Sequence, residues 1–511
     1  MTMAMPGAAN PPFNLARYCL TGAAPAPAKA ALEVTNDATA AAPSEAWTYE
    51  ALEDAVLRVA GGLQAMGFEP GARLLIRLDN TSVYPILFLG AIAAGLIAIP
   101  ASSQLTAPEA SFLRDDSGAS AVALAADLPR GDIPDGVRVI DEVAVLEMMR
   151  EGARAGYAAT RAEDPAYLIY TSGTTARPKG VVHAHRVGLG RRPMYQGWYG
   201  LSPADRVLHA GSFNWTYTLG VGLIDPWANG ATSVIFTGEK TPEVWPSLIR
   251  RSRATIFAAV PGLMRQILKY APPGPLDLGA LRHGLIAGEK PPEGVFDAWR
   301  ARTGTELYEA LGMSEISTYI STSPSTPRRA GCIGKAQAGR RVAILPIEGG
   351  DSPLPTGEDG LIAVHRSDPG LMLGYWRRPE EEAEVMRGDW FVGGDLGRLD
   401  ADGYVTHLGR ANDVMKALGY RVSPQEVEAA LAECPGVADV ACAEIRVRPD
   451  VSVIGAFIIR QPGAKIDAES VKAFAAARLA AYKQPREVIF VDKFPRTANG
   501  KVRRAELSKL I

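Results

Sequence analysis

The chain has 511 residues, of which 47% are hydrophobic and 22% are charged. This composition is ordinary for a globular protein and excludes wholesale disorder. Lys and Arg number 54 against 56 Asp and Glu, and this balance excludes a polycationic nucleic-acid coat and gives no reason to expect a membrane-surface protein.

The four cysteines have no CxxC spacing, so neither a zinc knuckle nor a redox pair is expected, and a reducing compartment is indicated. The first residues lack a basic segment followed by an apolar run. We therefore expect no secretory signal and a cytoplasmic protein. The most apolar stretch, residues 84–100, contains two glycines and is marginally short for a membrane span. It predicts a buried helix that runs into a strand.

Helices and strands alternate along most of the chain after an Ala/Pro-rich start of about 45 residues. Thr48 can cap a helix, which we expect Gly67 to end. A strand over residues 73–78 follows, and the alternation continues to about residue 287. The apolar face of this first helix holds Leu52, Ala55, Val56, Val59 and Leu63, and the later strands are expected at Val122, 167–170, 233–236, 255–259 and 284–287. This α/β alternation predicts parallel sheets with crossover helices.

The pattern changes after Ala343, where short strands separated by Gly/Asp turns predict an antiparallel, barrel-like region that ends near Arg410. A small α+β unit closes the chain. Ser423–Glu426 reads as a capping box with a proline at the first helical position, and a second helix is expected after Asp467. We therefore expect a large N-terminal domain of layered α/β sheets over 1–410, with a β-rich subdomain at about 343–410, and a small C-terminal domain over 411–511.

The strongest local signal for chemistry is the segment from Tyr170 to Gly180, YTSGTTARPKG, which directly follows a predicted strand. Glycines and small hydroxyl residues let backbone N–H groups curl around a polyphosphate, and Arg177 and Lys179 add positive charge. The segment is not a Walker A loop, because no Gly-Lys-Ser/Thr ending occurs. The alternative interpretation is a plain turn between a strand and a helix.

This loop resembles that of the adenylate-forming superfamily, which includes acyl-CoA synthetases, aryl-CoA ligases, luciferases and the adenylation domains of peptide synthetases. Ala176 stands where the family usually has glycine. The resemblance extends over roughly residues 47 to 506. Further family-like segments follow in the expected order at Ala287–Lys290, Leu311–Glu315, Trp390–Asp395, Gly409–Lys416 and Pro495–Lys501.

The resemblance implies ATP, Mg2+ and CoA as cofactor and co-substrates, and it implies a role for individual residues. Glu315 would hold the magnesium, which prefers carboxylate oxygen. Asp395 would accept hydrogen bonds from the ribose hydroxyls, and Lys501 would neutralise charge at the α-phosphorus. The implied ATP- and AMP-binding residues are Thr171, Ser172, Gly173, Thr174, Thr175, Lys179, Gly288, Glu289, Lys290, Glu309, Ala310, Leu311, Gly312, Met313, Ser314, Asp395, Arg410 and Arg421.

In the small C-terminal domain, the resemblance places Gly419 at the pantetheine tunnel for CoA and a hinge at Asn412. One active site must serve two reactions, and the family reorients this domain between them. We therefore expect a mobile C-terminal domain. His183 and His185 follow the phosphate loop and are interpreted as structural histidines, the other four histidines have no partner visible in the sequence, and none of the six is assigned a catalytic role.

The acid is expected to bind at the segment from Ser212 to Gly220, where the resemblance makes Trp215 an aromatic gate. Gly312 stands where acetyl-CoA synthetases have tryptophan, which favours an acid longer than two carbons. Amino-acid-loading domains usually have aspartate near the Phe213–Asn214 position, and no Asp lies between Ser212 and Ile224, which favours an apolar acid, medium-chain or aromatic. Tyr217 could donate to a hydroxylated acid, or Trp215 and Tyr217 could be plain core aromatics. The implied acyl pocket is Trp215, Thr216, Tyr217, Ala287 and Gly312.

The expected function is therefore that of an ATP-dependent acyl-CoA synthetase, which forms acyl-AMP and then the CoA thioester. Its partners would be a small carboxylic acid, ATP and CoA, with no nucleic acid and no transmembrane segment, and a homodimer is left open. The alternatives are a stand-alone adenylation enzyme that loads a carrier protein and a non-catalytic nucleotide-binding relative. The second alternative would be expected to lack Lys501 or Glu315, and both are present.

Overall fold

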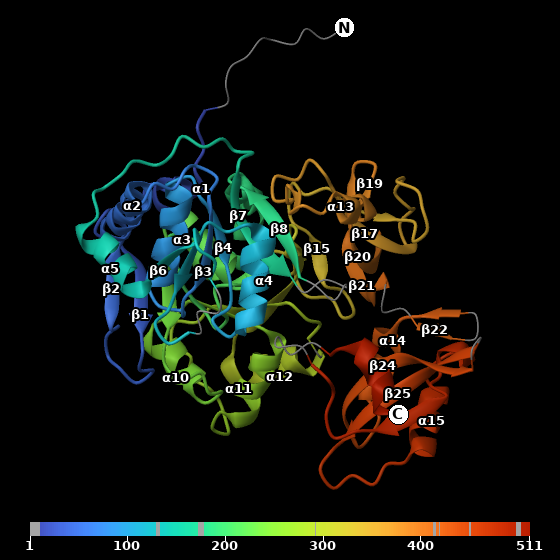
Figure 1. Cartoon of the computed structure of the whole chain (residues 1–511). Helices are drawn as coiled ribbons and strands as arrows, with labels where there is room; N and C mark the ends of the chain where they lie inside the picture. Colours follow the sequence, from blue (N-terminus) through green and yellow to red (C-terminus); the bar gives the residue numbers. More distant parts are fainter. Residues whose placement is uncertain are drawn as a thin grey trace. The chain divides into compact units, whose positions relative to one another are not determined.

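A computed structural model describes residues 11–128, 133–171, 178–291, 293–411, 415–417, 420–448, 451–496 and 502–511. The chain divides into two compact units, which are treated separately below (Figure 1). The first unit contains residues 1–341 and 366–384, and the second contains 342–365 and 385–511. The domain boundary expected at 410–412 stays a prediction.

The larger sheet of the first unit has the strand order β15-β14-β13-β12-β11-β9-β10-β1-β2. The run from β1 through β10, β9, β11 and β12 to β13 is parallel, and β2, β14 and β15 are antiparallel to their neighbours. The strands are β1 (Ala30–Thr35), β2 (Glu45–Thr48), β9 (Arg206–His209), β10 (Thr232–Phe236), β11 (Ile256–Ala259), β12 (His283–Ala287), β13 (Glu306–Met313), β14 (Ser317–Ser321) and β15 (Gly334–Ala336).

A second sheet in the same unit has the order β18-β8-β7-β4-β3-β5-β6. Strand β8 (Lys179–Ala184) is antiparallel to both β7 (Pro165–Thr171) and β18 (Gly374–Tyr375). The other strands are parallel: β3 (Arg73–Arg77), β4 (Ile97–Pro100), β5 (Ala121–Leu124) and β6 (Arg138–Asp141). The predicted parallel α/β architecture is confirmed.

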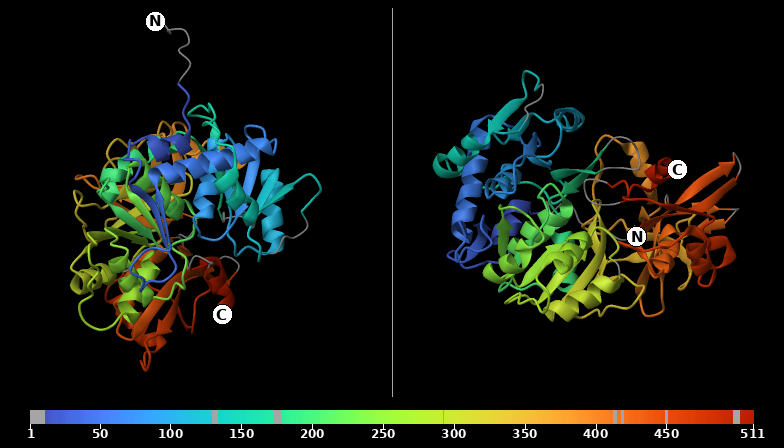
Figure 2. Two further views of the ribbon diagram at one scale, coloured as in Figure 1. Left: turned by 90° about the vertical axis from the view of Figure 1, so that its left-hand side faces the viewer. Right: turned by 90° about the horizontal axis from the view of Figure 1, so that it is seen from below.

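Helices α2 (Tyr49–Ala65) and α3 (Val83–Ala93) fill the space between the two sheets, because their buried residues share one core with β1, β3, β5 and β7 (Figure 2). The predicted cap is confirmed, since the Thr48 hydroxyl accepts from the Ala51 N–H at 3.1 Å. Every residue of α3 is buried, as predicted for the apolar stretch. Among the described residues, no helix combines the length and apolarity needed to cross a membrane.

Further helices of the first unit flank the sheets and connect their strands (Figure 1). Two of the connections, over residues 187–199 and 216–228, contain a π-helical turn, η1 (Tyr195–Tyr199) and η2 (Gly220–Ile224). The helices are α1 (Leu15–Thr21), α4 (Ala107–Ser117), α5 (Glu142–Glu151), α6 (Val187–Gly190), α7 (Arg192–Met194), α8 (Thr216–Leu219), α9 (Asp225–Ala228), α10 (Val244–Arg251), α11 (Pro261–Tyr270), α12 (Glu293–Thr303) and α13 (Pro379–Val385). π-Helical turns frequently lie near functional sites.

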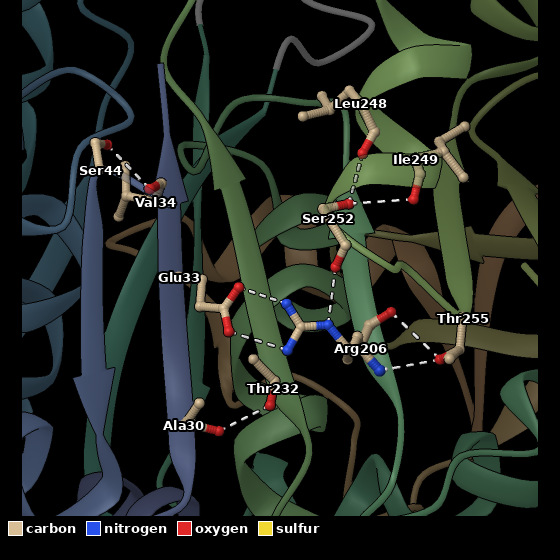
Figure 3. A network of polar contacts seen from close by, with 10 residues as sticks. All are labelled: Ala30, Glu33, Val34, Ser44, Arg206, Thr232, Leu248, Ile249, Ser252 and Thr255. Atoms are coloured by element: carbon tan, nitrogen blue, oxygen red, sulfur yellow. Dashed lines mark hydrogen bonds and ion pairs between the residues drawn. The ribbon is translucent and has the colours of Figure 1, made fainter. Parts of the chain in front are cut away.

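Near the β2 edge of the larger sheet, polar side chains around Arg206 on β9 connect neighbouring strands (Figure 3). Its guanidinium donates to both carboxylate oxygens of Glu33 on β1, and its Nε donates to the Ser252 carbonyl at 2.9 Å. The Arg206 N–H donates to the Thr255 hydroxyl at 2.9 Å. This bidentate pair spans β10, which lies between β1 and β9, and so holds the parallel strands in register.

A buried ion pair joins the two π-containing connections. Arg191 donates from Nε and Nη2 to the two carboxylate oxygens of Asp225, each at 2.6 Å, and both side chains are almost completely buried. The Tyr199 hydroxyl also donates to Asp225. Gly220 is required here, because a Cβ on it would lie 1.9 Å from Arg191 Nη2. Since a buried charge is tolerated only when paired, this network fixes the two connections together.

The second unit contains an antiparallel sheet with the order β16-β17-β20-β21, a hairpin of β22 and β23, and a sheet with the order β24-β25-β26. The short strands predicted after Ala343 are confirmed, but the described strands of this unit do not close into a barrel. Its elements are β16 (Val342–Leu345), β17 (Asp359–His365), β19 (Met386–Arg387), β20 (Trp390–Leu399), β21 (Tyr404–Arg410), β22 (Met415–Ala417), β23 (Tyr420–Val422), α14 (Pro424–Ala432), β24 (Val437–Arg448), β25 (Val451–Arg460), α15 (Ala468–Ala476), η4 (Ala481–Lys483), β26 (Glu487–Phe490), α16 (Arg504–Leu507) and η5 (Ser508–Leu510).

The capping box predicted at Ser423 is wrong, although the helix starts where expected. Pro424 is the first residue of α14, but the Ser423 side chain makes no hydrogen bond to the helix. Its hydroxyl donates instead to the Leu408 carbonyl on β21. The second predicted helix is confirmed, because Asp467 caps α15 by accepting from the Ser470 N–H at 2.8 Å.

The stability of the first unit is expected to decrease as the pH falls from about 6.5 to about 4. Burial lowers the pKa of His183, His185 and His283 from 6.5 to about 4 and that of His209 to about 3. In this window the unfolded chain binds protons that the folded chain excludes, so protonation favours unfolding. Melting temperatures measured from pH 7.5 to 4.5 would test this, and a melting temperature constant from pH 6.5 to 5 would contradict it.

Candidate functional site

Most predicted site residues of the first unit lie at one edge of the larger sheet. Strands β9, β11, β12 and β13 are parallel and adjacent, so their carboxyl ends meet at this edge. The segment with Trp215 follows β9, Ala287 ends β12, and Glu309–Met313 is the end of β13. Ligands of open α/β sheets bind outside the carboxyl ends of the strands. The fold therefore brings together the predicted acyl-binding and adenine-binding segments.

Glu315 lies in the turn between β13 and β14, and four contacts hold this turn. The Tyr375 hydroxyl donates to Glu315 Oε1 at 2.8 Å, and the Met372 N–H donates to the Glu315 carbonyl at 2.7 Å. His183 Nε2 donates to the Ser314 carbonyl at 2.7 Å, and Arg191 Nη1 donates to the Ser317 hydroxyl at 2.5 Å. The carboxylate predicted to hold magnesium thus lies on a turn that is fixed from several sides.

The residues around Glu315 fit a magnesium ion that arrives with a nucleotide. Among the described residues, no group of three or more His, Cys, Asp or Glu side chains could hold a metal ion. Mg2+ is commonly bound through one or two carboxylates, with substrate phosphates and water completing its coordination. The Glu315 carboxylate, whose Oε1 is oriented by the Tyr375 hydroxyl, suits this way of binding Mg2+.

The base of the predicted phosphate loop is formed by Thr171 on β7 and Lys179 on β8, which are paired across the two strands. The Lys179 ammonium forms an ion pair with Glu381 of α13 and lies 5.2 Å from the centre of the Tyr375 ring. The lysine is therefore held near the turn with Glu315. Seven predicted site residues lie outside the described residues: Ser172, Gly173, Thr174, Thr175, Asn412, Gly419 and Lys501.

The predicted acyl segment forms the start of the helix over 216–228, and Trp215 is its partly exposed N-cap residue. The Tyr217 ring stacks on Trp198, with 5.9 Å between centroids. Its hydroxyl lies 3.1 Å from the Leu285 carbonyl and 3.3 Å from the Ala259 carbonyl, to which it can donate. Backbone carbonyls thus accept the Tyr217 proton in this structure, and a hydrogen bond from Tyr217 to a hydroxylated acid stays a prediction. Tyr217 supplies an apolar ring.

The geometry at Gly312 gives another reason for glycine than the one expected. A Cβ on Gly312 would lie 2.6 Å from the Ser317 carbonyl oxygen and 2.8 Å from Thr318 Cα. The direction that a side chain would take is thus filled by the β14 backbone and not by open space. The assignment of Gly312 to the acyl pocket stays a prediction.

Replacing Gly312 with alanine is expected to push β14 away and to displace the Glu315 turn. Overpacking of this kind costs about 1–3 kcal/mol of stability, and adenylation should fall with it. The melting temperature and the rate of pyrophosphate release would be measured together. The matched control is Gly294→Ala in α12, where a Cβ meets nothing within 4 Å. Wild-type stability and rate in the Gly312 variant would contradict the expected overpacking.

Glu289, in the predicted adenine segment, has a structural contact. Its Oε1 accepts from the Gly262 N–H at 3.0 Å, near the N-terminus of α11, where a carboxylate is favourable. The preceding Gly288 has a φ of +98°, a conformation that favours glycine. Of the remaining predicted residues, Lys290 follows the end of β12, Arg421 lies in β23, and β13 contains Ala310, Leu311 and Met313.

In the second unit, Asp395 on β20 is the centre of a small charged cluster. It is 5% exposed, His407 Nε2 lies 3.0 Å from its Oδ1, and Arg410 Nη1 donates to its Oδ2 at 3.0 Å. Burial alone would raise the pKa of Asp395, but the His407 hydrogen bond and the Arg410 charge together hold it below its usual 3.8. The carboxylate stays ionised and keeps lone pairs for hydroxyl donors, as the predicted ribose contact requires.

His407 is a member of this cluster that the sequence interpretation missed. Asp395 pairs with Arg410 across β20 and β21, which makes Arg410 easy to place. Regular alternation would put His407 on the opposite face of β21 from Arg410, since the two residues are three positions apart. The pairing shifts between Leu396 and Gly397, which places one extra residue, Leu408, in β21. This bulge brings His407 onto the face of Asp395.

Comparison with known proteins gives consistent matches over nearly the whole chain. The AMP-binding enzyme family model matches residues 21–376, and the model of the AMP-binding enzyme C-terminal domain matches residues 426–501. A 3-hydroxybenzoate–CoA ligase from Aromatoleum sp. (strain CIB) is 29% identical, with 91% of each chain covered.

Two solved structures have the same fold as this chain. The ATP-bound MatB of Rhodopseudomonas palustris superposes with a TM-score of 0.87 at 26% identity, over 97% of this chain and 99% of MatB. The anthranilate CoA ligase AuaEII, in complex with anthranoyl-AMP, gives a TM-score of 0.86 at 27% identity, over 98% of this chain and 97% of that one.

The fold and its strand-end site define an enzyme of the adenylate-forming architecture. The chain belongs to the AMP-binding enzyme family. The predicted family and the predicted enzyme class, an AMP-forming acid–thiol ligase, are both confirmed. The alternative of an enzyme that loads a carrier protein is not favoured.

Proposed function

We propose that the protein is an ATP-dependent acyl-CoA synthetase whose acid is apolar, with an aromatic carboxylic acid as the first candidate and a medium-chain acid as the second. The observation that carries the proposal is the assembly, at the carboxyl ends of β9, β12 and β13, of an aromatic-lined segment beside the turn with Glu315. The ligases of hydroxybenzoate and anthranilate among the similar proteins support an aromatic acid.

The acyl-binding segment offers mainly aromatic and apolar surface. Tyr217 contributes its ring, which stacks on Trp198, and Ala287 ends β12 in a buried position. Asn214 Oδ1 is buried and has no hydrogen-bond partner among the described residues. This acceptor next to Trp215 suits an aromatic acid with a hydroxyl or amino substituent, because a donor on the acid would satisfy it.

In the first reaction, the carboxylate oxygen of the acid attacks the α-phosphorus of ATP, and pyrophosphate leaves. Asp395 would orient the ribose, Lys179 and Lys501 would face the phosphates, and Glu315 would hold a magnesium ion that neutralises phosphate charge. Such transfers depend mainly on positioning and electrostatics. In the second reaction, the CoA sulfur attacks the acyl carbon and AMP leaves. We further propose that the C-terminal domain reorients about Asn412 between the two steps, with Gly419 lining the CoA tunnel.

A panel of acids assayed for pyrophosphate release and for CoA thioester formation tests this proposal. We expect benzoate or one of its hydroxyl or amino derivatives to give the highest kcat/KM, with hexanoate and octanoate next and acetate far lower. Each methylene or substituent that a pocket discriminates changes kcat/KM by roughly 10–200-fold. If phenylalanine or acetate were the best substrate, the proposed substrate class would be wrong.

A further inference from the structure

Tyr375 connects the predicted magnesium carboxylate with the strand that follows the predicted phosphate loop. Its hydroxyl donates to Glu315 Oε1 at 2.8 Å, and its side chain is largely buried. Strand β18, where it lies, pairs with β8 so that Tyr375 is opposite Val181. The phenol thus reaches the Glu315 turn from β18, the strand paired with β8, which begins at Lys179.

Two further contacts link β8 to the same turn. The Lys179 ammonium lies 5.2 Å from the centre of the Tyr375 ring, a distance at which a cation is attracted to an aromatic ring. His183, four residues further along β8, donates to the Ser314 carbonyl at 2.7 Å. Burial lowers the pKa of His183 to about 4, so the ring is neutral at pH 7 and its Nε2 carries the proton. Strand β8 therefore holds the turn at its backbone, and the paired strand β18 holds it at its carboxylate.

We propose that Tyr375 is a positioning residue for Glu315, which fixes the carboxylate through Oε1 and leaves Oε2 for the magnesium of MgATP. This inference rests on the proposed function. Mg2+ demands near-ideal octahedral geometry, so a carboxylate that rotates freely binds it less well than one that is held. Hydrogen-bond partners of ligating carboxylates commonly contribute 10–100-fold to metal affinity.

The test uses Tyr375→Phe, which removes only the hydroxyl. Calorimetry would measure the Kd of the α,β-methylene analogue of ATP with Mg2+ and again with EDTA, in the full-length protein. The Kd in EDTA divided by the Kd with Mg2+ reports how much the metal tightens nucleotide binding. We expect the variant to reduce this ratio on the order of 10-fold and to leave the Kd in EDTA unchanged.

The matched control is Tyr157→Phe, which removes a phenol that donates to Glu53 Oε1 at 2.9 Å in the same unit. It should leave the ratio and both Kd values at wild-type levels. Glu315→Gln supplies a second background, because adding Tyr375→Phe to it should reduce the ratio no further if both residues act through one contact. Melting temperatures would establish that each variant is folded.

A wild-type ratio in Tyr375→Phe would overturn the proposal, and so would an equal loss of affinity with and without Mg2+, which would indicate a purely structural role. Additive losses in the double variant would also overturn it. Failure of the proposed function has a different signature: the wild-type protein would then release no pyrophosphate with any acid of the panel. Nucleotide binding by the wild type is measured independently of that assay.

Discussion

Replacing Lys501 with alanine is expected to slow acyl-adenylate formation on the order of 100-fold or more, the cost of removing one preorganised group that stabilises charge in a transition state. The first reaction builds up charge at the α-phosphorus, whereas the second displaces AMP from carbon. Thioester formation from supplied acyl-AMP should therefore largely persist. Pyrophosphate release and thioester formation from synthetic acyl-AMP would be measured separately.

The described residues on either side of Lys501 are paired, because Arg496 and Val502 form an antiparallel bridge and the Arg503 N–H donates to the Pro495 carbonyl at 2.8 Å. Lys493→Ala is the matched control, since it removes an exposed lysine from the same basic region. It should change neither rate. An equal decrease of both half-reactions in the Lys501 variant would indicate a structural role for this lysine.

Replacing Asp225 with asparagine is expected to destabilise the first unit by about 3–5 kcal/mol, because it leaves the buried Arg191 guanidinium without a compensating charge. The side chains differ little in size, so the effect isolates the charge. Urea unfolding followed by tryptophan fluorescence would measure it, since Trp198 and Trp227 are buried near the ion pair.

Asp277→Asn is the control for this experiment. Asp277 pairs with Arg250 at 3.2 Å, and both side chains are more than half exposed, so its loss should cost less than about 1 kcal/mol. Arg191 also donates to the Ser317 hydroxyl, two residues after Glu315. Adenylation should therefore slow in Asp225→Asn even without urea, where the variant is still folded. A stability equal to that of Asp277→Asn would mean that the buried pair contributes little.

The sequence predicted the regular parts of the fold well, because there the local signals agree. The Thr48 cap, the apolar face of α2 and the parallel strands were all expected and are observed. The helix over 216–228 was not expected. Its π-helical turn shifts the spacing of apolar residues away from the 3.6-residue period that reveals a helix.

For the candidate site, the motifs placed Glu315 and Asp395, but their partners could not be predicted. The pairing of β18 with β8 places Tyr375 so that its hydroxyl reaches Glu315, a residue 60 positions earlier in the chain. His407 reaches Asp395 only because of an irregular pairing in β21. From the sequence, the missing side chain at Gly312 was expected to leave room for the acid. In the structure, it allows the β14 backbone to approach closely. Such contacts depend on tertiary register, which a single sequence does not encode locally.

The π-helical turn at Gly220–Ile224 divides the helix over 216–228 into two parts with different contacts. Residues before it, Thr216 and Tyr217, belong to the predicted acyl segment, whereas Asp225 and Trp227 after it anchor the helix to Arg191 and to the Ala31 carbonyl. The extra residue in the turn rotates the side chains before it about the helix axis, relative to those after it. Under the proposed function, a substitution at the half-buried Thr216 would therefore change the acid-binding segment while the Asp225 and Trp227 contacts remain in place.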